Sequence, residues 1–329
     1  MSEAPSPLPV HVLTGFLGSG KTTILNRVLK APNLSNTAVV INEFGDVALD
    51  HLLVERSDDT LVKLAGGCVC CTVRGDLATT LLQLIHQRDT GAVTPFERIV
   101  IETSGLADPT PIVNLFSTDA LLGERVRCAG VTATLDALNG ATTLERYIES
   151  RQQILLADGI VLTKRDLHPG ASPALMRALN PAAPTLDACA VSDASLCAWL
   201  TGERARQAAP AAADHVHTHG VMSFTLERQR PVAPAAISLF VQALATHVGA
   251  QLLRVKGLVR LTGIDGQPAV LQGAQHVFQP LELLPSWPAY APRRTQLTCI
   301  VQGDCADLIE ALFDAVIADV DWLEASSRA

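Results

Sequence analysis

The sequence predicts an α/β fold: a doubly wound, mostly parallel sheet with helices on both faces, followed by a smaller C-terminal α+β domain. Three observations carry this prediction. Short apolar runs alternate with stretches of helical spacing through residues 9–167. The runs are continuously apolar, as in parallel strands that are buried on both faces. Beyond an Ala/Pro-rich and then His-containing stretch near 203–220, strands and helices follow a different order.

The first domain is expected to alternate strands with helices. The strands are predicted at residues 9–14, 37–44, 59–67, 96–105, 126–137 and 158–167. The helices are predicted at residues 22–30, 74–88 and 145–157.

The composition change predicts three segments, which are a domain at 1–208, a linker at 209–220 and a second domain at 221–329. In and just before the last segment we expect a strand, a helix, a hairpin-like pair of strands, a further strand and a closing amphipathic helix. Their ranges are 220–227, 233–248, 252–263 with 268–278, 295–302 and 305–320.

Composition and charge exclude several classes of protein. The chain has 329 residues, enough for two domains, with 48% hydrophobic and 18% charged residues. Its net charge of −8 argues against a nucleic-acid partner, which would require a basic face. The sequence contains no run of about 18 apolar residues, and its N-terminus lacks the regions of a secretory signal. We therefore expect a cytoplasmic protein that binds neither nucleic acid nor membrane.

Residues 15–22, GFLGSGKT, fit the P-loop pattern G-x-x-x-x-G-K-[ST] between an expected strand and an expected helix. Glycines let backbone N–H groups face the phosphates, and the helix N-terminus adds its positive dipole end. Lys21 is expected to contact the β- and γ-phosphates, and the Thr22 hydroxyl to coordinate Mg²⁺. The residues expected to bind the nucleotide here are Gly15, Gly18, Ser19, Gly20, Lys21, Thr22 and Thr23.

Two later segments complete the expected nucleotide site. Glu102 ends a buried strand, where it is placed to hold Mg²⁺ or to orient the attacking water. Residues 163–166, TKRD, resemble the guanine-reading sequence N-K-x-D, in which Asp166 would accept hydrogen bonds from guanine and the Lys164 stem would pack on the base. Thr163 stands where asparagine is usual, which leaves the strength of base selection open. GTP is preferred over ATP as the expected nucleotide.

Residues 66–71, GGCVCC, hold three thiols within four positions, a density with no packing explanation. Thiolates favour Zn²⁺ and similar ions, and a site with at most three ligands from one short segment suits a metal that must leave again. A redox pair and structural thiols stay open as alternatives, although Cys70 interrupts the C-x-x-C spacing. Cys128 and Cys299 lie in apolar, strand-like runs and are expected to pack in the core. The expected metal ligands are Cys68, Cys70 and Cys71.

Two further segments are candidates for metal contact. Residues 41–50, INEFGDVALD, lie where a P-loop GTPase places a switch that senses the γ-phosphate. Glu43 is a candidate ligand of Mg²⁺ or of the cargo metal, and an ordinary acidic turn is the alternative. In the linker, strict alternation places three imidazoles on one side of an extended segment, which favours auxiliary, low-affinity metal capture over a plain solvated linker. These are His215, His217 and His219.

Taken in order, GFLGSGKTT, INEFGDVALDH, GGCVCC, ETSGLADP and TKRD resemble the CobW-type GTPases, the metallochaperone family that includes the zinc-regulated metalloprotein activators. The resemblance covers the first domain and extends more weakly into the second through RVKGLV, LQGAQHVF and Trp287. It implies a P-loop NTPase fold and slow hydrolysis of GTP to GDP. It also implies that hydrolysis is coupled to loading of Zn²⁺, or less often Co²⁺, from the C-x-C-C motif into a client metalloprotein.

The resemblance thus predicts a GTP-hydrolysing metallochaperone whose catalytic residues are Lys21, Glu43 and Glu102. A GTP-dependent client activator with a regulatory metal, a zinc buffer or sensor, and a small-molecule kinase are the competing interpretations. Residues 221–329 are expected to recognise the client, because they contain no catalytic constellation of their own. A homodimer that depends on nucleotide or metal is left open.

Overall fold

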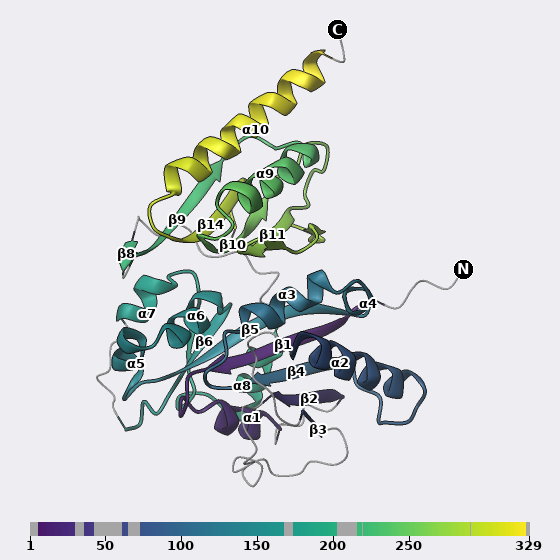
Figure 1. The fold of residues 1–329 in the computed structure, drawn as a ribbon, viewed down its shortest axis with the longest axis vertical. Helices are drawn as coiled ribbons and strands as arrows, with labels where there is room; N and C mark the ends of the chain where they lie inside the picture. Colours follow the sequence, from purple (N-terminus) through teal and green to yellow (C-terminus); the bar gives the residue numbers. More distant parts are fainter. Residues whose placement is uncertain are drawn as a thin grey trace. The chain divides into compact units, whose positions relative to one another are not determined.

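A computed structural model describes residues 6–29, 36–42, 61–64, 73–167, 174–202, 216–218, 220–289 and 291–326. The chain divides into two compact units, each with its own sheet (Figure 1). Unit 1 comprises Met1–Met176 and Ala183–Ala205, and unit 2 comprises Arg177–Ala182 and Arg206–Ala329. The linker limits of 209–220 stay a prediction. Within them, however, residues 216–218 form a strand that pairs with the next strand of unit 2.

The sheet of unit 1 has the strand order β3-β2-β4-β1-β5-β6-β7, and every neighbouring pair is parallel. The central strands β1, β4 and β5 are buried almost throughout, as their continuously apolar sequences predict. The predicted doubly wound sheet is therefore confirmed. The strands are β1 (Leu8–Gly15), β2 (Thr37–Asn42), β3 (Leu61–Leu64), β4 (Arg98–Thr103), β5 (Val126–Asp136), β6 (Gly159–Thr163) and β7 (Thr185–Asp187).

Helices cover both faces of this sheet. On one face, α1 and α8 pack together on strand side chains that include Leu13, Val100 and Val161. α3 and α6 contact β5 and lie on the opposite side of the sheet from α1 and α8 in Figure 1. The helices are α1 (Lys21–Leu29), α2 (Val73–Asp89), α3 (Thr110–Thr118), α4 (Ala120–Gly123), α5 (Gly140–Arg146), α6 (Ile148–Leu156), α7 (Ala174–Leu179) and α8 (Asp193–Leu200).

The structure differs from the predicted elements of unit 1 in two ways. The single helix expected at 145–157 is two helices, because Tyr147 between α5 and α6 adopts an extended backbone with φ −115° and ψ 123°. Five short elements were not predicted, namely α3, α4, α7, β7 and α8. α3 carries a proline in its first turn, where proline is well tolerated.

Unit 2 is built on an antiparallel sheet with the strand order β12-β11-β10-β14-β9-β8, and β13 pairs with β11. β10 and β11 form the predicted hairpin, so the α+β second domain is confirmed. The strands are β8 (Val216–Thr218), β9 (Val221–Arg228), β10 (Leu252–Val259), β11 (Ala269–Ala274), β12 (Val277–Phe278), β13 (Glu282–Leu283) and β14 (Thr295–Gln302).

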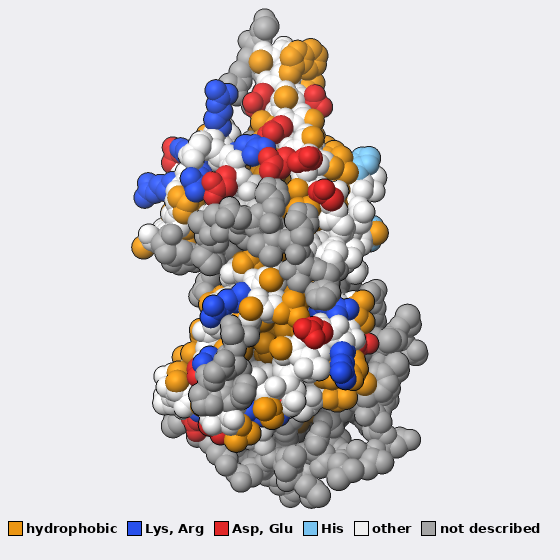
Figure 2. All heavy atoms as spheres, turned by 90° about the vertical axis from the view of Figure 1, so that its left-hand side faces the viewer, with side chains coloured by type: hydrophobic (Ala, Val, Ile, Leu, Met, Phe, Trp, Pro, Cys, Tyr) orange, Lys and Arg blue, Asp and Glu red, His pale blue; other side chains and the backbone are white. Residues whose placement is uncertain are grey.

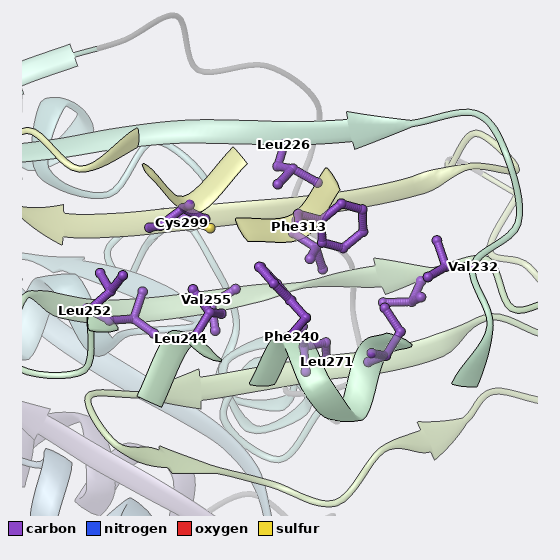
Figure 3. Close-up of a cluster of buried hydrophobic side chains, with 14 of the residues drawn as sticks. Leu226, Val232, Phe240, Leu244, Leu252, Val255, Leu271, Cys299 and Phe313 are labelled. Atoms are coloured by element: carbon purple, nitrogen blue, oxygen red, sulfur yellow. The ribbon is translucent and has the colours of Figure 1, made fainter. Parts of the chain in front are cut away.

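Two helices, α9 (Pro234–His247) and α10 (Ala306–Ser326), supply the other half of the unit 2 core. Figure 3 shows Phe240 and Phe313 from these helices among side chains of the sheet. Their ring centroids are 4.8 Å apart in an edge-on arrangement. Cys299 is fully buried in this cluster and Cys128 is buried in β5, as predicted for both.

Acidic and basic side chains are interspersed on the face of the molecule drawn in Figure 2. In unit 2, Arg228 pairs with Glu310 and Asp314 of α10. Within the part of the chain that the structure describes, no helix is both long and apolar enough to cross a membrane.

Candidate nucleotide site

The P-loop forms the turn between β1 and α1. Gly15, Gly18 and Gly20 have φ values of 142°, 69° and 94°, a region that side chains disfavour. A Cβ on Gly15 would lie 2.3 Å from the side-chain oxygen of Thr134 on β5, so only glycine fits there. The Ser19 hydroxyl shares a hydrogen bond of 2.6 Å with that same oxygen. The loop is therefore held tightly against β5.

Lys21 folds back over the P-loop. Its Nζ donates hydrogen bonds to the carbonyls of Gly15 (2.8 Å) and Phe16 (3.2 Å), and the residue is 8% exposed. An ammonium group has three donors. A phosphate oxygen bound in the loop could therefore accept a hydrogen bond from Nζ in addition to these carbonyls or in place of one of them. Lys21 therefore lies at the P-loop, and its contact with phosphates stays a prediction.

Two of the residues predicted to hold Mg²⁺, Thr22 and Glu102, lie together. The Thr22 hydroxyl donates to Oε1 of Glu102 over 2.8 Å, and Glu102 is 3% exposed at the end of β4. Two neighbouring oxygen ligands in an octahedral Mg²⁺ site lie about 2.9 Å apart, because each is about 2.0–2.1 Å from the ion. A hydroxyl and a carboxylate at this spacing therefore fit the chemistry of Mg²⁺.

Thr163, which stands in place of the usual asparagine, ties β6 to the P-loop. Its hydroxyl donates to the carbonyl of Ser19 over 2.7 Å, although the two residues are 144 positions apart in sequence. A Cβ on Gly20 would lie 3.2 Å from the Thr163 methyl group, so the two backbones are close. The threonine thus makes a structural contact with the phosphate loop rather than facing solvent.

Lys164 bridges the P-loop and an acid that the sequence did not single out. Its Nζ donates to the Gly18 carbonyl (2.8 Å) and to Oδ2 of Asp136 (2.7 Å) at the end of β5. Burial raises the pKa of Asp136, but hydrogen bonds from Lys164, the Leu138 N–H and Asn139 outweigh it and hold this pKa below its usual value. The sequence signal that could have identified Asp136 is its position at the end of the apolar run VTATLD.

A cavity of about 110 Å³ lies beside the P-loop on the side of β5. Backbone and side chains of the P-loop form one wall, and the turn that leads into α5 forms another. Its lining residues are Phe16, Leu17, Gly18, Ser19, Thr134, Leu135, Asp136, Asn139, Gly140, Thr143 and Lys164.

The segment that follows Glu102 is fixed close to the P-loop. Gln153 of α6 donates from Nε2 to the carbonyls of Gly105 (3.1 Å) and Ala107 (3.0 Å). A Cβ on Gly105 would lie 2.8 Å from the backbone nitrogen of Leu17. Sequence reasoning missed Gln153, because nothing in its helical surroundings indicates a contact 48 positions away.

Asp166 is exposed at the turn after β6, and its Oδ1 accepts a hydrogen bond of 3.3 Å from the Cys189 thiol. Among the cysteines that the structure describes, Cys189 alone is exposed. His217 lies on β8. Outside the described residues lie Glu43, Cys68, Cys70, Cys71, His215 and His219. The described residues contain no group of three His, Cys, Asp or Glu side chains that could hold a metal ion.

Comparisons with known proteins cover both units. A family model described as "CobW/HypB/UreG, nucleotide-binding domain" matches residues 9–187, and one for the "Cobalamin synthesis protein cobW C-terminal domain" matches residues 221–317. The zinc chaperone YjiA of Escherichia coli is 31% identical over 283 residues, which cover 83% of this chain and 88% of that protein.

Two more similarities extend these matches. Zinc-regulated GTPase metalloprotein activator 1 of Schizosaccharomyces pombe is 34% identical over 178 residues, which cover 52% of this chain and 42% of that protein. A crystal structure of Zn(II)-bound YjiA GTPase from E. coli matches with a TM-score of 0.69 at 26% identity, covering 95% of this chain and 99% of that one.

Proposed function

Because this chain belongs to the CobW/HypB/UreG family, we propose that it is a GTP-hydrolysing metallochaperone that binds Zn²⁺ and transfers it to client metalloproteins. The membership and the relatives named as zinc chaperones support a metal-handling GTPase. The observation that supports hydrolysis most directly is the contact between Thr22 and Glu102 beside the P-loop lysine, because it joins the phosphate-binding loop to a buried carboxylate.

In the proposed reaction, the P-loop N–H groups and Lys21 bind the phosphates, and the N-terminus of α1 adds its positive dipole end. Glu102, at the end of β4, orients the attacking water. Mg²⁺ held by Thr22 and Glu102 would neutralise charge on the phosphates when it is bound. Lys164 and Asp166 hold the guanine base, and Thr163 keeps the loop in place from the side of β6.

The metal half of the proposal rests on the C-x-C-C motif and on the relatives. Cys68, Cys70 and Cys71 are the proposed ligands of Zn²⁺, with Glu43 as a candidate fourth. A Zn(II)-bound structure also exists for a YjiA variant in which one glutamate and two cysteines are alanine. Zinc binding by itself is therefore a weak test, and the decisive property is whether nucleotide controls the affinity.

The test is a competitive Zn²⁺ titration against a chromophoric chelator. The protein is measured without nucleotide, with Mg²⁺ and GDP, and with Mg²⁺ and a non-hydrolysable GTP analogue. We expect one tight site that appears or strengthens with the triphosphate analogue, because coupling by linkage requires different affinities in the two states. Replacing Cys68, Cys70 and Cys71 with serine should remove it, whereas Cys305→Ser, which removes a buried thiol of unit 2, should leave it.

Equal Zn²⁺ affinity in all three states would contradict the proposed cycle and favour a zinc buffer or sensor. Client recognition is assigned to residues 221–329, since the predicted nucleotide and thiol residues all precede them. A client that matures with free Zn²⁺ in the absence of this protein would instead favour an activator whose metal is regulatory.

A further inference from the structure

One buried amide side chain, outside all the sequence motifs, holds the segment that follows Glu102. Gln153 of α6 is 1% exposed, and its Nε2 donates to the carbonyls of Gly105 (3.1 Å) and Ala107 (3.0 Å). Both partners are carbonyl oxygens, which only accept, so the amide nitrogen must be the atom that faces them. A single side chain therefore joins α6 to the segment after β4 by two hydrogen bonds.

Packing alone does not explain an amide at this position. The other polar atom of the amide, Oε1 of Gln153, is buried and has no hydrogen-bond partner among the described residues. A buried polar atom without a partner destabilises the fold, whereas an apolar side chain of similar length, such as methionine, would fill the space without that cost. The two donated hydrogen bonds are therefore what glutamine contributes here.

The segment that Gln153 holds is a turn packed on the P-loop. The N–H of Ala107 donates to the carbonyl of Ser104 over 3.1 Å and closes the turn. A Cβ on Gly105 would lie 2.8 Å from the backbone nitrogen of Leu17, so the turn and the P-loop are in contact there. The turn is thus fixed by its own backbone, by the P-loop and by the amide from α6.

α6 is also attached to the P-loop at its N-terminal end. Tyr147 directly precedes the helix, and the centroid of its ring lies 4.6 Å from that of Phe16. Arg151 fixes this junction, because its Nη1 donates to the carbonyls of Leu144 (2.9 Å) and Glu145 (3.0 Å) in α5. α6 therefore contacts the P-loop at one end and the turn through the buried amide, and it fixes the two relative to each other.

We propose that Gln153 is a positioning residue for GTP hydrolysis. It holds the 104–107 turn against the P-loop. The turn comes directly after Glu102, whose carboxylate is proposed to orient the attacking water, so the amide keeps this end of β4 in place for the reaction at the terminal phosphate. The predicted guanine contacts, Lys164 and Asp166, follow β6 and do not depend on it. This inference rests on the proposed GTPase function.

Gln153→Met in the full chain tests this role, because it keeps the length of the side chain and removes both donors. We expect kcat for GTP hydrolysis to fall by roughly tenfold or more, since a small misplacement at a reacting centre slows the reaction strongly. The affinity for GDP, which lacks the reacting phosphate, should stay unchanged in calorimetric titration. Gln296→Met, which removes a buried amide that donates to Glu227 in unit 2, is the matched control and should change neither quantity.

Gln153→Glu provides a second arm. A protonated carboxyl can donate one hydrogen bond, whereas a carboxylate donates none. The turnover of this variant relative to wild type should therefore rise as the pH falls from about 9 to 6, a range in which buried carboxyl groups titrate. The same ratio for Gln153→Met should stay constant, because methionine does not titrate. A ratio for Gln153→Glu that is equally constant would contradict the need for a donor.

The outcomes separate this inference from the proposed function. Wild-type protein that does not hydrolyse GTP would refute the GTPase itself. Wild-type hydrolysis with an unchanged kcat in Gln153→Met would refute only the positioning role. A parallel loss of kcat and of GDP affinity would also overturn it, since that is the effect of a damaged fold rather than of a displaced turn.

Discussion

Three side chains of the nucleotide site, Lys21, Thr163 and Lys164, all donate hydrogen bonds to carbonyls of the P-loop. Because a peptide unit is planar, the contacts of Thr163 and Lys164 with the Ser19 and Gly18 carbonyls also fix the N–H groups of the residues that follow. Thr163 and Lys164, which are 144 and 146 positions from their partners, thereby prepare the backbone of the loop that is predicted to bind phosphates.

Thr163→Val tests this preparation. The substitution keeps the shape but removes the hydroxyl, and it leaves the Ser19 carbonyl without its 2.7 Å donor. We expect a loss of about 1–3 kcal/mol in the free energy of unfolding and weaker GDP binding. Thr90→Val removes an exposed hydroxyl that also donates to a backbone carbonyl, and should change stability by less than about 0.5 kcal/mol. Equal effects in denaturant melts would contradict the role of Thr163.

Asp136 predicts a defined pH dependence. Its folded-state pKa is lowered, since hydrogen bonds from Lys164 and its neighbours outweigh the opposing effect of burial. A lowered carboxyl pKa contributes stability that is present above the usual value of 3.8 and is lost as the pH falls through the folded-state pKa. The difference in unfolding free energy between wild type and Asp136→Asn should therefore be constant at neutral pH and shrink below pH 3.8. Urea titration at several pH values measures this difference in unfolding free energy. A change in the difference near neutral pH would contradict its assignment to Asp136.

At the scale of elements, α10 shows how an amphipathic pattern becomes a packed core. Ile309, Phe313 and Val320 lie on one side of the helix and are buried against the sheet of unit 2, while Leu308 is 45% exposed. The spacing of four between the first two places them on the same face. The helix then runs to Ser326, six residues beyond the predicted end, because no glycine or proline interrupts it.

Phe313→Ala should destabilise unit 2 by about 3–5 kcal/mol, since it removes a fully buried ring beside Phe240 and leaves a cavity. Leu308→Ala, at a partly exposed position on the same helix, should lower the free energy of unfolding by less than about 0.5 kcal/mol. Urea unfolding followed by circular dichroism measures the loss. GDP affinity should be unchanged, because the predicted nucleotide-binding residues all belong to unit 1. A drop in GDP affinity would show that the two units depend on each other.

At the scale of the whole molecule, the predicted activities are divided between two separate cores. The predicted P-loop and guanine-reading residues belong to unit 1, whereas the three histidines fall within the range of unit 2. The strand β8 at residues 216–218 pairs the middle of the histidine segment with β9 of the unit 2 sheet.

Replacing His215, His217 and His219 with alanine should reduce the number of weakly bound Zn²⁺ ions and leave the GTP hydrolysis rate nearly unchanged. The reason is that these residues belong to a different unit from the phosphate-binding loop. His247→Ala, which removes an exposed imidazole from α9 of the same unit, is the matched control for both measurements. A matching fall in GTP turnover would mean that the histidines act on the nucleotide site.

Local sequence patterns by themselves determined the P-loop, the parallel sheet, the buried Cys128 and Cys299, and the hairpin of β10 and β11. Each of these features depends on the types of residues that lie close together in sequence. In a strand, turn or helix the local backbone fixes where such residues lie relative to one another. The C-x-C-C and switch segments also rest on such patterns, and they stay predictions because they lie outside the described residues.

Only the tertiary structure decided which side chains contact the P-loop from other strands. The contacts of Thr163 with Ser19, Lys164 with Gly18, and Arg27 with the 188–193 segment join residues that are 144 to 166 positions apart. Parallel strands whose carboxyl ends meet at one edge bring their following loops together, whatever their separation in the chain. No periodicity or motif length reaches that far, so these contacts follow from the order of the strands.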